Sequence, residues 1–346
     1  MFEYLHGKPG FWSKTGPNAD VAFSTRIRLA RNLASVSFPH MQEEGEVVVI
    51  KSIASRFVAD SVYGKSLSLV DVASLDNNDK RFLRERNIIT PEMELSSSSF
   101  VIMDGNDDFT ILVNEEDHFR IQVISPGFQV METYRVADAV DDELNRMVSY
   151  AYSDDLGYLT TCASNLGTGL RVSAMLHLPA LTMMRSIGDV TRVVHDYGAE
   201  LKGGAGSDGK TIGNMYQVSN KISLGKSEID ILEEFDEVAL MLIQMENEAR
   251  DDYIAQYGRQ LEDRICRSYG LIAYSRILNY VDAMENLSNI RLGVVLSIIK
   301  NIELHKINDL MINVQCSHLQ KSAQRVFSDE LECDSYRADF LRAQFS

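Results

Sequence analysis

The sequence predicts an α+β protein, in which an antiparallel β-sheet flanked by helices is followed by a helical C-terminal domain. Short segments that alternate between apolar and polar residues recur through the first 220 residues, and several are spaced as hairpins. Segments with helical spacing lie between them, and after residue 226 nearly all the periodicity is helical. Strands that pair with their chain neighbours and are covered by helices are typical of this fold class.

The expected elements of the first part follow in chain order. Residues 21–32 alternate like a strand, and residues 98–124 predict two or three strands. We expect a helix at 135–152 and a second helix at 170–185, which begins directly after a Gly-Thr-Gly. Residues 213–225 return to alternation and predict a further strand.

The later part of the chain is expected to be helical. Ser227 and Asp230 have the spacing of a capping box, which predicts a long amphipathic helix that runs to about residue 250. We therefore predict two domains, a catalytic domain at 1–256 and a helical C-terminal domain at 257–346.

Composition narrows the class of protein. A chain of 346 residues is long enough for two domains with sizeable cores. The formal net charge of −16 argues against binding of nucleic acid over a broad surface, although a local cluster of arginines could still bind phosphate.

The sequence also predicts a cytoplasmic protein without a membrane span. The N-terminus lacks the apolar core of a signal peptide, and the longest apolar stretches, such as 292–301, are far shorter than a span requires. The four cysteines are scattered, which favours reduced thiols over a metal or redox motif. The seven histidines form no ligand pair at helical spacing, so we expect no protein metal site.

The first candidate motif is STRIRLARN at 24–32. In a strand, Arg26 and Arg28 point to the same face, where two guanidinium groups repel each other unless an anion lies between them. Phosphate matches such a pair because arginine binds it with two parallel hydrogen bonds. The alternative is a solvated strand face with carboxylate partners.

The second candidate motif is VNEEDHFRIQ at 113–122. Three acids in a row inside an apolar strand are unusual, and on a strand Glu116, His118 and Arg120 would share a face. A carboxylate beside a phosphate-binding cation suits phosphoryl transfer to a basic acceptor. The alternative is a charged cluster at the edge of a turn.

The third candidate motif is the glycine-rich segment at 162–173, in which Gly167 and Gly169 are expected to lead into a helix. Free backbone N–H groups at a helix N-terminus attract anions, and Arg171 in the first turn would add to that attraction. Cys162 would lie near this positive terminus, which would lower the pKa of its thiol. A plain glycine turn and an inert cysteine are the alternatives.

Residues 204–211 match the P-loop pattern literally. A P-loop follows a buried strand and opens a helix. Here the preceding segment is not a hydrophobic strand, and the following segment alternates like a strand. A glycine-rich loop that closes over a ligand is the better interpretation.

Taken together and in this order, the segments resemble those of the phosphagen kinases, which are ATP:guanidino phosphotransferases. The chain is most similar to the bacterial protein-arginine kinases, with which it also shares runs at 177–181, 261–270 and 289–300. The resemblance covers nearly the whole chain. It implies transfer of phosphate from ATP to arginine side chains of proteins, with Mg²⁺ carried on the nucleotide.

The resemblance also implies roles for individual residues. Arg26, Arg28, Arg120 and Arg171 would contact phosphate, and Glu116 and Cys162 would act on the guanidinium. The nucleotide site would be lined by Ser24, Thr25, Ile27, Val172, Ser173, Ala174 and Met175. The implied partners are proteins with exposed arginines, an activator protein and a second copy of the chain.

The chain departs from the family pattern in three places, two of them in the catalytic part. The family's flexible loop, R-G-x-x-G-E, corresponds to Lys202 through Ser207, so serine stands in place of a second catalytic glutamate and Asp208 follows it. Asn87 stands where arginine kinases have a histidine near the nucleotide.

In the C-terminal motif R-D-x-x-R-A, which is implied to bind phosphoarginine, the first arginine is Cys333, while Asp334 and Arg337 are kept. Three hypotheses follow from the departures: an active protein-arginine kinase, a nucleotide-binding pseudokinase or adaptor, and a kinase of a small guanidino metabolite.

Overall fold

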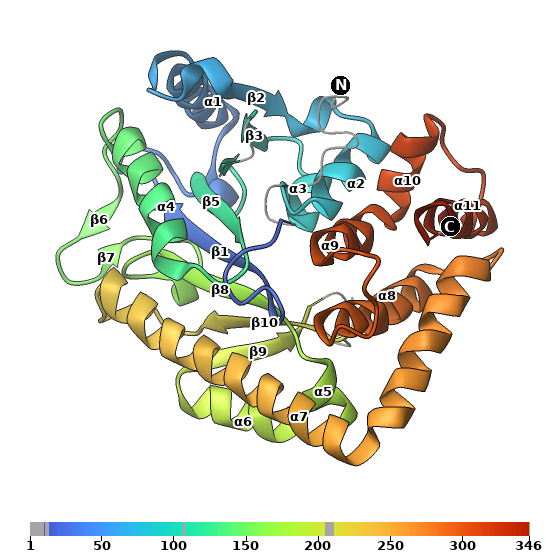
Figure 1. The fold of residues 1–346 in the computed structure, drawn as a ribbon. Helices are drawn as coiled ribbons and strands as arrows, with labels where there is room; N and C mark the ends of the chain where they lie inside the picture. Colours follow the sequence, from blue (N-terminus) through green and yellow to red (C-terminus); the bar gives the residue numbers. More distant parts are fainter. Residues whose placement is uncertain (1–9, 11–13, 106–107, 205–210, 346) are drawn as a thin grey trace.

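An eight-stranded antiparallel sheet forms the centre of the molecule (Figure 1). The structure is a computed structural model that describes residue 10 and residues 14–105, 108–204 and 211–345. The strand order is β2-β3-β4-β5-β1-β8-β10-β9. The strands are β1 (Ala22–Arg31), β2 (Leu67–Asp71), β3 (Phe100–Asp104), β4 (Thr110–Val113), β5 (Phe119–Pro126), β8 (Leu170–His177), β9 (Ala199–Gly203) and β10 (Met215–Asn220), and a separate small ribbon pairs β6 (Tyr152–Ser153) with β7 (Gly157–Tyr158).

One face of the sheet is apolar and is covered by helices. The largest core cluster packs the apolar side chains of this face against α1 (Glu44–Asp60), α4 (Val130–Asn145), α6 (Ile187–Asp196) and the first part of α7 (Glu228–Tyr274). The other face is covered at one edge by α2 (Asn77–Glu85) and α3 (Pro91–Leu95), which pack on β3 and β4. These two helices therefore do not cover the middle of this second face.

The C-terminal part of the chain is helical, as the sequence predicts. After the short α5 (Pro179–Met183) and the long α7 come α8 (Tyr280–Val295), α9 (Leu304–Asn313), α10 (Cys316–Ala323) and α11 (Glu330–Phe345). Figure 1 shows α8 to α11 gathered on one side of the sheet. None of the helices in the described part of the chain is long and apolar enough to cross a membrane.

The beginning of α7 confirms the predicted capping box. The Ser227 hydroxyl accepts a hydrogen bond from the Asp230 backbone N–H, and the Asp230 carboxylate accepts one from the Ser227 N–H. The helix continues beyond the expected end near residue 250 and leaves helical geometry at Tyr257, where φ is −134°. The predicted division after residue 256 falls at this kink.

A buried arginine attaches the C-terminal helices to the sheet. Arg291 of α8 donates hydrogen bonds to the carbonyl of Ala19 at 2.6 Å and to Asn308 of α9 at 3.0 Å, and it lies 2.9 Å from Nδ1 of His177 at the end of β8. These contacts fix the position of α8 and α9 relative to the start of β1 and the end of β8.

The predicted helix at 170–185 is wrong. Residues 170–177 form β8, which pairs with β1 on one side and β10 on the other, and a helix begins only at Pro179. Leu170, Val172, Ala174 and Leu176 are all buried in the core, so the apolar residues follow a period of two. The expected helix at 135–152 is also displaced, because α4 begins at Val130 and ends at Asn145.

A buried ion pair between β1 and α4 should contribute strongly to the free energy of unfolding. Arg31 at the end of β1 is 1% exposed, and its guanidinium contacts the Asp141 carboxylate at 2.6 Å. Tyr150 donates a further hydrogen bond to Asp141 at 2.8 Å. Removing the Asp141 charge leaves the buried Arg31 with the longer contact to Glu228 at 3.5 Å, so we expect Asp141→Asn to lower the free energy of unfolding by about 3–5 kcal/mol.

Urea unfolding of Asp141→Asn measures this effect. Asp142→Asn is the matched control because Asp142 is the exposed neighbour on the same helix. The control should unfold within about 0.5 kcal/mol of the parent. Equal stability of the two variants would contradict the structural role of the pair.

Candidate active site

Four arginines meet on the exposed polar face of the sheet. In antiparallel pairing, directly opposed residues share a face. Arg28 of β1 lies opposite Arg171 of β8, and Ala30 of β1 lies opposite Arg120 of β5. Together with Arg26 they line a cavity of about 300 Å³ that Glu116 and Cys162 also line. The structure thus places the six residues that the sequence analysis assigned to phosphate and guanidinium around one cavity.

Arg28 is partly buried and lies among like charges. Burial lowers the pKa of Arg28 well below its ordinary value, and the charges of Arg26, Arg120 and Arg171 lower it further. Its Nε is buried without a hydrogen-bond partner, and no carboxylate of the described residues lies within ion-pair distance of its guanidinium. The alternative of a solvated face with carboxylate partners therefore does not describe this position.

Arg26 stands beside Arg28 in the same field. The pKa of Arg26 is lowered to about 10, mainly by burial and then by the positive charges of Arg171 and Arg120. Its Nη2 donates to Gln217 of β10 at 3.1 Å, which is a neutral partner and leaves the positive charge uncompensated. The two neighbouring guanidinium groups create a strongly positive cavity, and a phosphate chain would neutralise it.

Two glutamates hold Arg120, but only one of them faces the solvent. Glu115 contacts Nη1 of Arg120 at 2.7 Å and its side chain is 6% exposed, whereas the side chain of Glu116, which contacts Nη2, is 39% exposed. Glu115 also accepts a hydrogen bond from Thr90 at 3.0 Å. Glu115 is therefore fixed behind Arg120, while Glu116 is the carboxylate that can reach a ligand in the cavity.

The expectation that Glu116, His118 and Arg120 share a strand face is wrong. Residues 114–118 are the loop between β4 and β5, and β5 begins only at Phe119. His118 is buried, accepts a hydrogen bond from the Leu33 N–H at 2.9 Å and lies 2.8 Å from the carbonyl of Ser37. The histidine thus anchors the loop from behind and does not face the cavity.

Asp117 connects the glutamate loop to the cysteine segment. Its carboxylate, which is fully buried, accepts hydrogen bonds from Asn32 at 2.6 Å and from the Thr161 backbone N–H at 2.8 Å. Asp117 directly follows Glu116, and Thr161 directly precedes Cys162. One buried carboxylate therefore sets the distance between the two groups that the sequence analysis assigned to the guanidinium.

The glycines after Cys162 lead into a strand, so the argument from a helix N-terminus is wrong. Gly169 has φ +68°, and a Cβ at this position would lie 2.5 Å from the carbonyl oxygen of Ala30 and 2.7 Å from Nη1 of Arg31. The glycine is needed because the segment passes directly against β1. Its role is a close approach of two backbones, and no helix dipole acts on Cys162 or Arg171 there.

Four of the residues assigned to the nucleotide have side chains on the opposite face of the sheet. Because strand residues alternate, Thr25 and Ile27 on β1 and Val172 and Ala174 on β8 point into the apolar core, and each is at most 1% exposed. Their side chains therefore do not face the cavities on the polar side of the sheet. Ser24, Ser173 and Met175 remain, because each lines a second cavity on the polar face.

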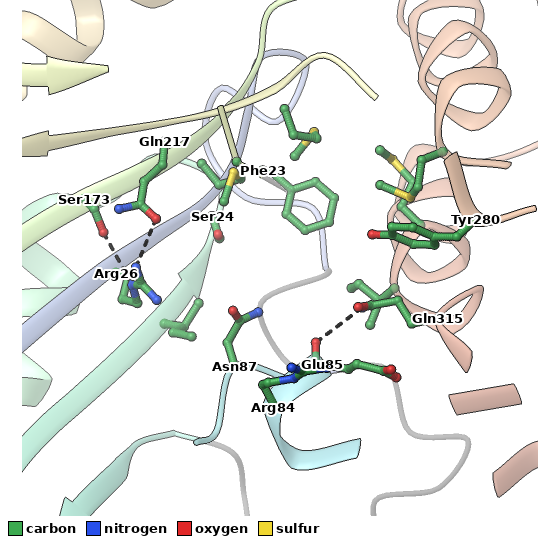
Figure 2. Close-up of a pocket in the computed structure, with 17 residues that line it drawn as sticks. Phe23, Ser24, Arg26, Arg84, Glu85, Asn87, Ser173, Gln217, Tyr280 and Gln315 are labelled. Atoms are coloured by element: carbon green, nitrogen blue, oxygen red, sulfur yellow. Dashed lines mark hydrogen bonds between the residues drawn. The ribbon is translucent and has the colours of Figure 1, made fainter. Parts of the chain in front are cut away.

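This second cavity adjoins the first and has a volume of about 360 Å³. The two share Arg26 and Gln217 (Figure 2). The sheet contributes one wall, the end of α2 contributes Arg84 and Glu85 with Asn87 just after it, and the C-terminal helices contribute the wall opposite the sheet. That wall consists of Tyr280, Met284, Met311, Ile312 and Gln315, none of which the sequence analysis singled out.

Glu85 at the edge of the second cavity should make stability depend on pH. Burial raises its pKa to about 7, while N–H groups of Ser317 and His318 act in the opposite direction. A raised carboxyl pKa means that the fold loses stability as the pH rises from about 4.5 through 7, because ionising the buried group is unfavourable. We expect the Tm of Glu85→Gln relative to the parent to increase between pH 5 and pH 8.

Thermal unfolding of the parent and Glu85→Gln at several pH values tests this expectation. Exposed Glu132→Gln on α4 is a suitable control, and its Tm difference from the parent should not vary with pH. A Glu85→Gln difference that stays constant across the range would contradict the raised pKa.

The segment with the P-loop pattern lies between two paired strands. It follows β9 and precedes β10, which pair antiparallel, so it lacks the strand–loop–helix setting of a P-loop. Lys202 at the end of β9 pairs with Glu200 at 2.9 Å. Ser207, Asp208 and the expected loop closure lie outside the described residues.

Comparison with known proteins agrees with this geometry. Residues 48–249 match the family model of the ATP:guanido phosphotransferase C-terminal catalytic domain, and residues 258–346 match that of the protein-arginine kinase McsB C-terminal domain. The protein-arginine kinase of Geobacillus sp. (strain WCH70) is 39% identical over 333 residues, which cover 95% of this chain and 92% of that protein. The protein-arginine kinase of Bacillus subtilis (strain 168) is 37% identical over 90% of this chain and 86% of its own length.

Solved structures show the same fold at greater distance. Lombricine kinase aligns with a TM-score of 0.60 at 22% identity, over 71% of this chain and 73% of that chain. The duplicated taurocyamine kinase from Schistosoma mansoni gives a TM-score of 0.59 at 22% identity over 70% of this chain, which spans only 36% of that longer chain.

The fold and the arginine-lined cavity define a guanidino-kinase type of phosphotransferase. By its family matches and its full-length relatives, the chain belongs to the ATP:guanido phosphotransferase family, among the protein-arginine kinases.

Proposed function

We propose that this protein transfers the γ-phosphoryl group of Mg·ATP to a guanidinium nitrogen of arginine side chains in proteins. The observation that carries the proposal is Arg28, a partly buried cation that has three arginine neighbours and no carboxylate within ion-pair distance among the described residues. Such a cluster is unfavourable unless it binds a polyanion. The names of the full-length relatives support protein arginine as the acceptor.

The two adjoining cavities suggest how the nucleotide lies. The larger cavity, with its apolar Phe23, Met175 and Met284, accepts the adenosine, and the arginine-lined cavity accepts the phosphates. Arg26 lies where the two cavities meet. Phosphoryl transfer depends mostly on alignment and on cations that stabilise the equatorial oxygens, which the arginines supply.

Magnesium is expected to arrive with the nucleotide. Within the residues that the structure describes, no group of three or more His, Cys, Asp and Glu side chains is placed to hold a metal ion. Mg²⁺ commonly keeps several waters and binds through substrate phosphates, where it neutralises the charge that develops during transfer.

Glu116 is the carboxylate that we assign to the acceptor. A guanidinium has a pKa above about 12, so it is not deprotonated before the reaction. Glu116 can hold it by two hydrogen bonds and accept the proton of the attacking nitrogen while the N–P bond forms and the bond to the ADP oxygen breaks. Arg120 keeps its contact with Glu115 when Glu116 turns to the acceptor.

Cys162 and the loop after β9 complete the proposed site. Cys162 lines the same cavity as Glu116, so its thiol would lie beside the bound guanidinium. We propose that Asp208 serves as the second carboxylate in place of the glutamate that the family pattern has at Ser207.

Detection of phosphoarginine tests the proposed function. A basic protein incubated with the enzyme and Mg·ATP, with an activator protein from the same source supplied in parallel, should acquire acid-labile phosphoarginine that mass spectrometry locates. The Glu116→Ala enzyme should leave the basic protein unmodified. Binding of nucleotide without any phosphoarginine would favour the pseudokinase, and turnover of free arginine without protein modification would favour a metabolite kinase.

We further propose that the protein forms a homodimer through the second part of α7. Large apolar side chains are exposed there and just beyond, with Leu271 53%, Tyr274 79% and Ile277 58% exposed. A second copy would cover such a surface. Light scattering should give twice the chain mass for the parent and the mass of one chain for Tyr274→Glu, while Tyr197→Glu, at the exposed residue directly after α6, should remain dimeric.

A further inference from the structure

Two of the four cysteines lie close together in the C-terminal helices, next to a residue that lines the larger cavity. Cys316 begins α10, and Cys333 lies in the first turn of α11. Cys333 belongs to a small apolar cluster with Leu319 and Phe327, and Cys316 packs against this cluster, so the two side chains lie close enough to influence each other. No role in the proposed transfer uses either residue.

The surroundings of the two sulfurs give them different reactivity. Interaction with Cys333, a hydrogen bond from Gln320 and the charge of Arg337 together lower the pKa of Cys316, although burial acts in the opposite direction. The same pairing raises the pKa of Cys333. Arg337 also donates to Cys333 Sγ at 3.2 Å. The pairing therefore favours the thiolate form at Cys316 and the protonated thiol at Cys333.

The solvent exposure of the two cysteines follows the same order as their reactivity. Cys316 is partly exposed, whereas Cys333 is 3% exposed. A reagent in solution therefore meets the more nucleophilic sulfur first, and the buried thiol is placed to react second. This is the arrangement of an attacking and a resolving cysteine.

We propose that Cys316 and Cys333 form a redox-active dithiol that low-molecular-weight disulfides oxidise to an intrachain disulfide. The Cys316 thiolate attacks one sulfur of the reagent, the reagent's S–S bond breaks and one thiolate leaves. Cys333 then loses its proton and attacks Cys316 Sγ, which displaces the second reagent thiolate. Two electrons pass from the protein to the reagent, and one protein S–S bond forms.

The position of Cys316 links this chemistry to the nucleotide cavity. Gln315, directly before it, lines the cavity and donates to the carbonyl of Glu85 at 3.4 Å. Ser317, directly after it, donates its backbone N–H to the Glu85 carboxylate at 3.3 Å (the Gln315 contact is drawn in Figure 2). Closing a disulfide brings the two sulfurs to about 2.05 Å, which would shift the start of α10, where Gln315 and Ser317 contact Glu85.

Oxidation should therefore weaken nucleotide binding, a consequence that rests on the proposed placement of ATP in this cavity. Loss of one or two hydrogen bonds at the cavity edge corresponds to an affinity lower by about two- to tenfold. The covalent change itself does not depend on any activity of the protein.

The experiment equilibrates the full-length reduced chain in glutathione buffers of increasing oxidised fraction. Free thiols are then blocked by alkylation, and peptides are mapped by mass spectrometry. The parent should lose two hydrogens in mass and yield a peptide cross-linked between Cys316 and Cys333. Cys333→Ala should instead carry a mixed disulfide with glutathione on Cys316, and Cys316→Ala should leave Cys333 unmodified.

Cys266→Ala is the matched control because Cys266 is exposed on α7 and lies outside the cluster. It should form the cross-link at the same glutathione ratio as the parent. The proposal is overturned if Cys316 and Cys333 remain separately alkylated at a ratio at which Cys266 of the parent is already glutathionylated. ATP affinity of the reduced and oxidised chain, measured by calorimetry, tests the link to the cavity.

Equal ATP affinity of the two forms would overturn that link. Failure of the reduced chain to bind ATP would count against the proposed function and leave the disulfide result standing. Thermal unfolding of each alanine variant in its reduced form shows whether the variant is folded.

Discussion

Glu116→Gln is expected to lower kcat for phosphoryl transfer by about 10²–10⁴-fold, the usual contribution of a positioned acid–base group. Glutamine keeps the size of the side chain and can still contact Arg120, but it cannot accept the proton of the attacking guanidinium nitrogen. Because the nucleotide is held by the arginines, the KM for ATP should stay close to the parental value. Steady-state kinetics with a saturating basic protein substrate measure both quantities.

The design of this test depends on the different positions of the two neighbouring glutamates. Glu115 is buried against Arg120 and Thr90, so Glu115→Gln should disturb Arg120 and raise the KM for ATP. Glu116 is 39% exposed and should affect kcat alone. Parental kcat in Glu116→Gln, or a fall caused entirely by a higher KM for ATP, would contradict the assignment of Glu116 as the proton acceptor.

The arginine cluster could be predicted from sequence because its geometry is local. Arg26 and Arg28 share a face in any strand, and a pair of neighbouring cations without acids between them requires an anion wherever the strand lies. The sheet then adds Arg120 and Arg171 from its two neighbouring strands through the observed register. The same rule of alternation, applied to every position, would have excluded Thr25 and Ile27 from the site.

The identity of β8 could not be decided locally. Residues 170–185 contain apolar residues that satisfy a helical period as well as a period of two, and methionine, leucine and alanine favour helices. The segment becomes a strand because β1 and β10 pair with it on both sides, and these partners lie far away in the sequence. Tertiary pairing overrides weak local preference, which is the usual cause of such errors.

The wall of the larger cavity is the part of the site that sequence analysis missed. Tyr280 and Gln315 are separated by more than two hundred residues from Ser24, which they face across the cavity. Their positions depend on how α8 and α9 pack on the end of the sheet, which Arg291 fixes through Ala19 and His177. No motif in either segment indicates a ligand, because the residues are ordinary for a helical surface.

Arg28→Met is expected to stabilise the free protein and to abolish phosphoryl transfer. Replacing a partly buried cation by an apolar side chain of similar length removes the unfavourable desolvation of charge and the repulsion from Arg26, Arg120 and Arg171. Urea unfolding in the absence of phosphate and nucleotide should therefore show a variant at least as stable as the parent.

The same substitution should remove the response to nucleotide. A ligand that binds only the folded protein stabilises it by RT ln(1 + [L]/Kd), so ATP should raise the Tm of the parent. In Arg28→Met the phosphates lose a cation at the centre of the cluster, and the rate of transfer should fall by about 10³-fold or more. The Tm of the variant should hardly change on addition of ATP.

Arg192→Met is the matched control, because Arg192 is an exposed arginine on α6 whose side chain is 80% exposed. It should unfold like the parent, respond to ATP like the parent and transfer phosphate at the parental rate. An Arg28→Met protein that is several kcal/mol less stable than the parent without ligand would show that Arg28 supports the fold. A variant that keeps the full thermal shift with ATP would show that the phosphates bind elsewhere. The stability that this chain gives up at Arg28 is, in this interpretation, the physical cause of its affinity for the transferred phosphate.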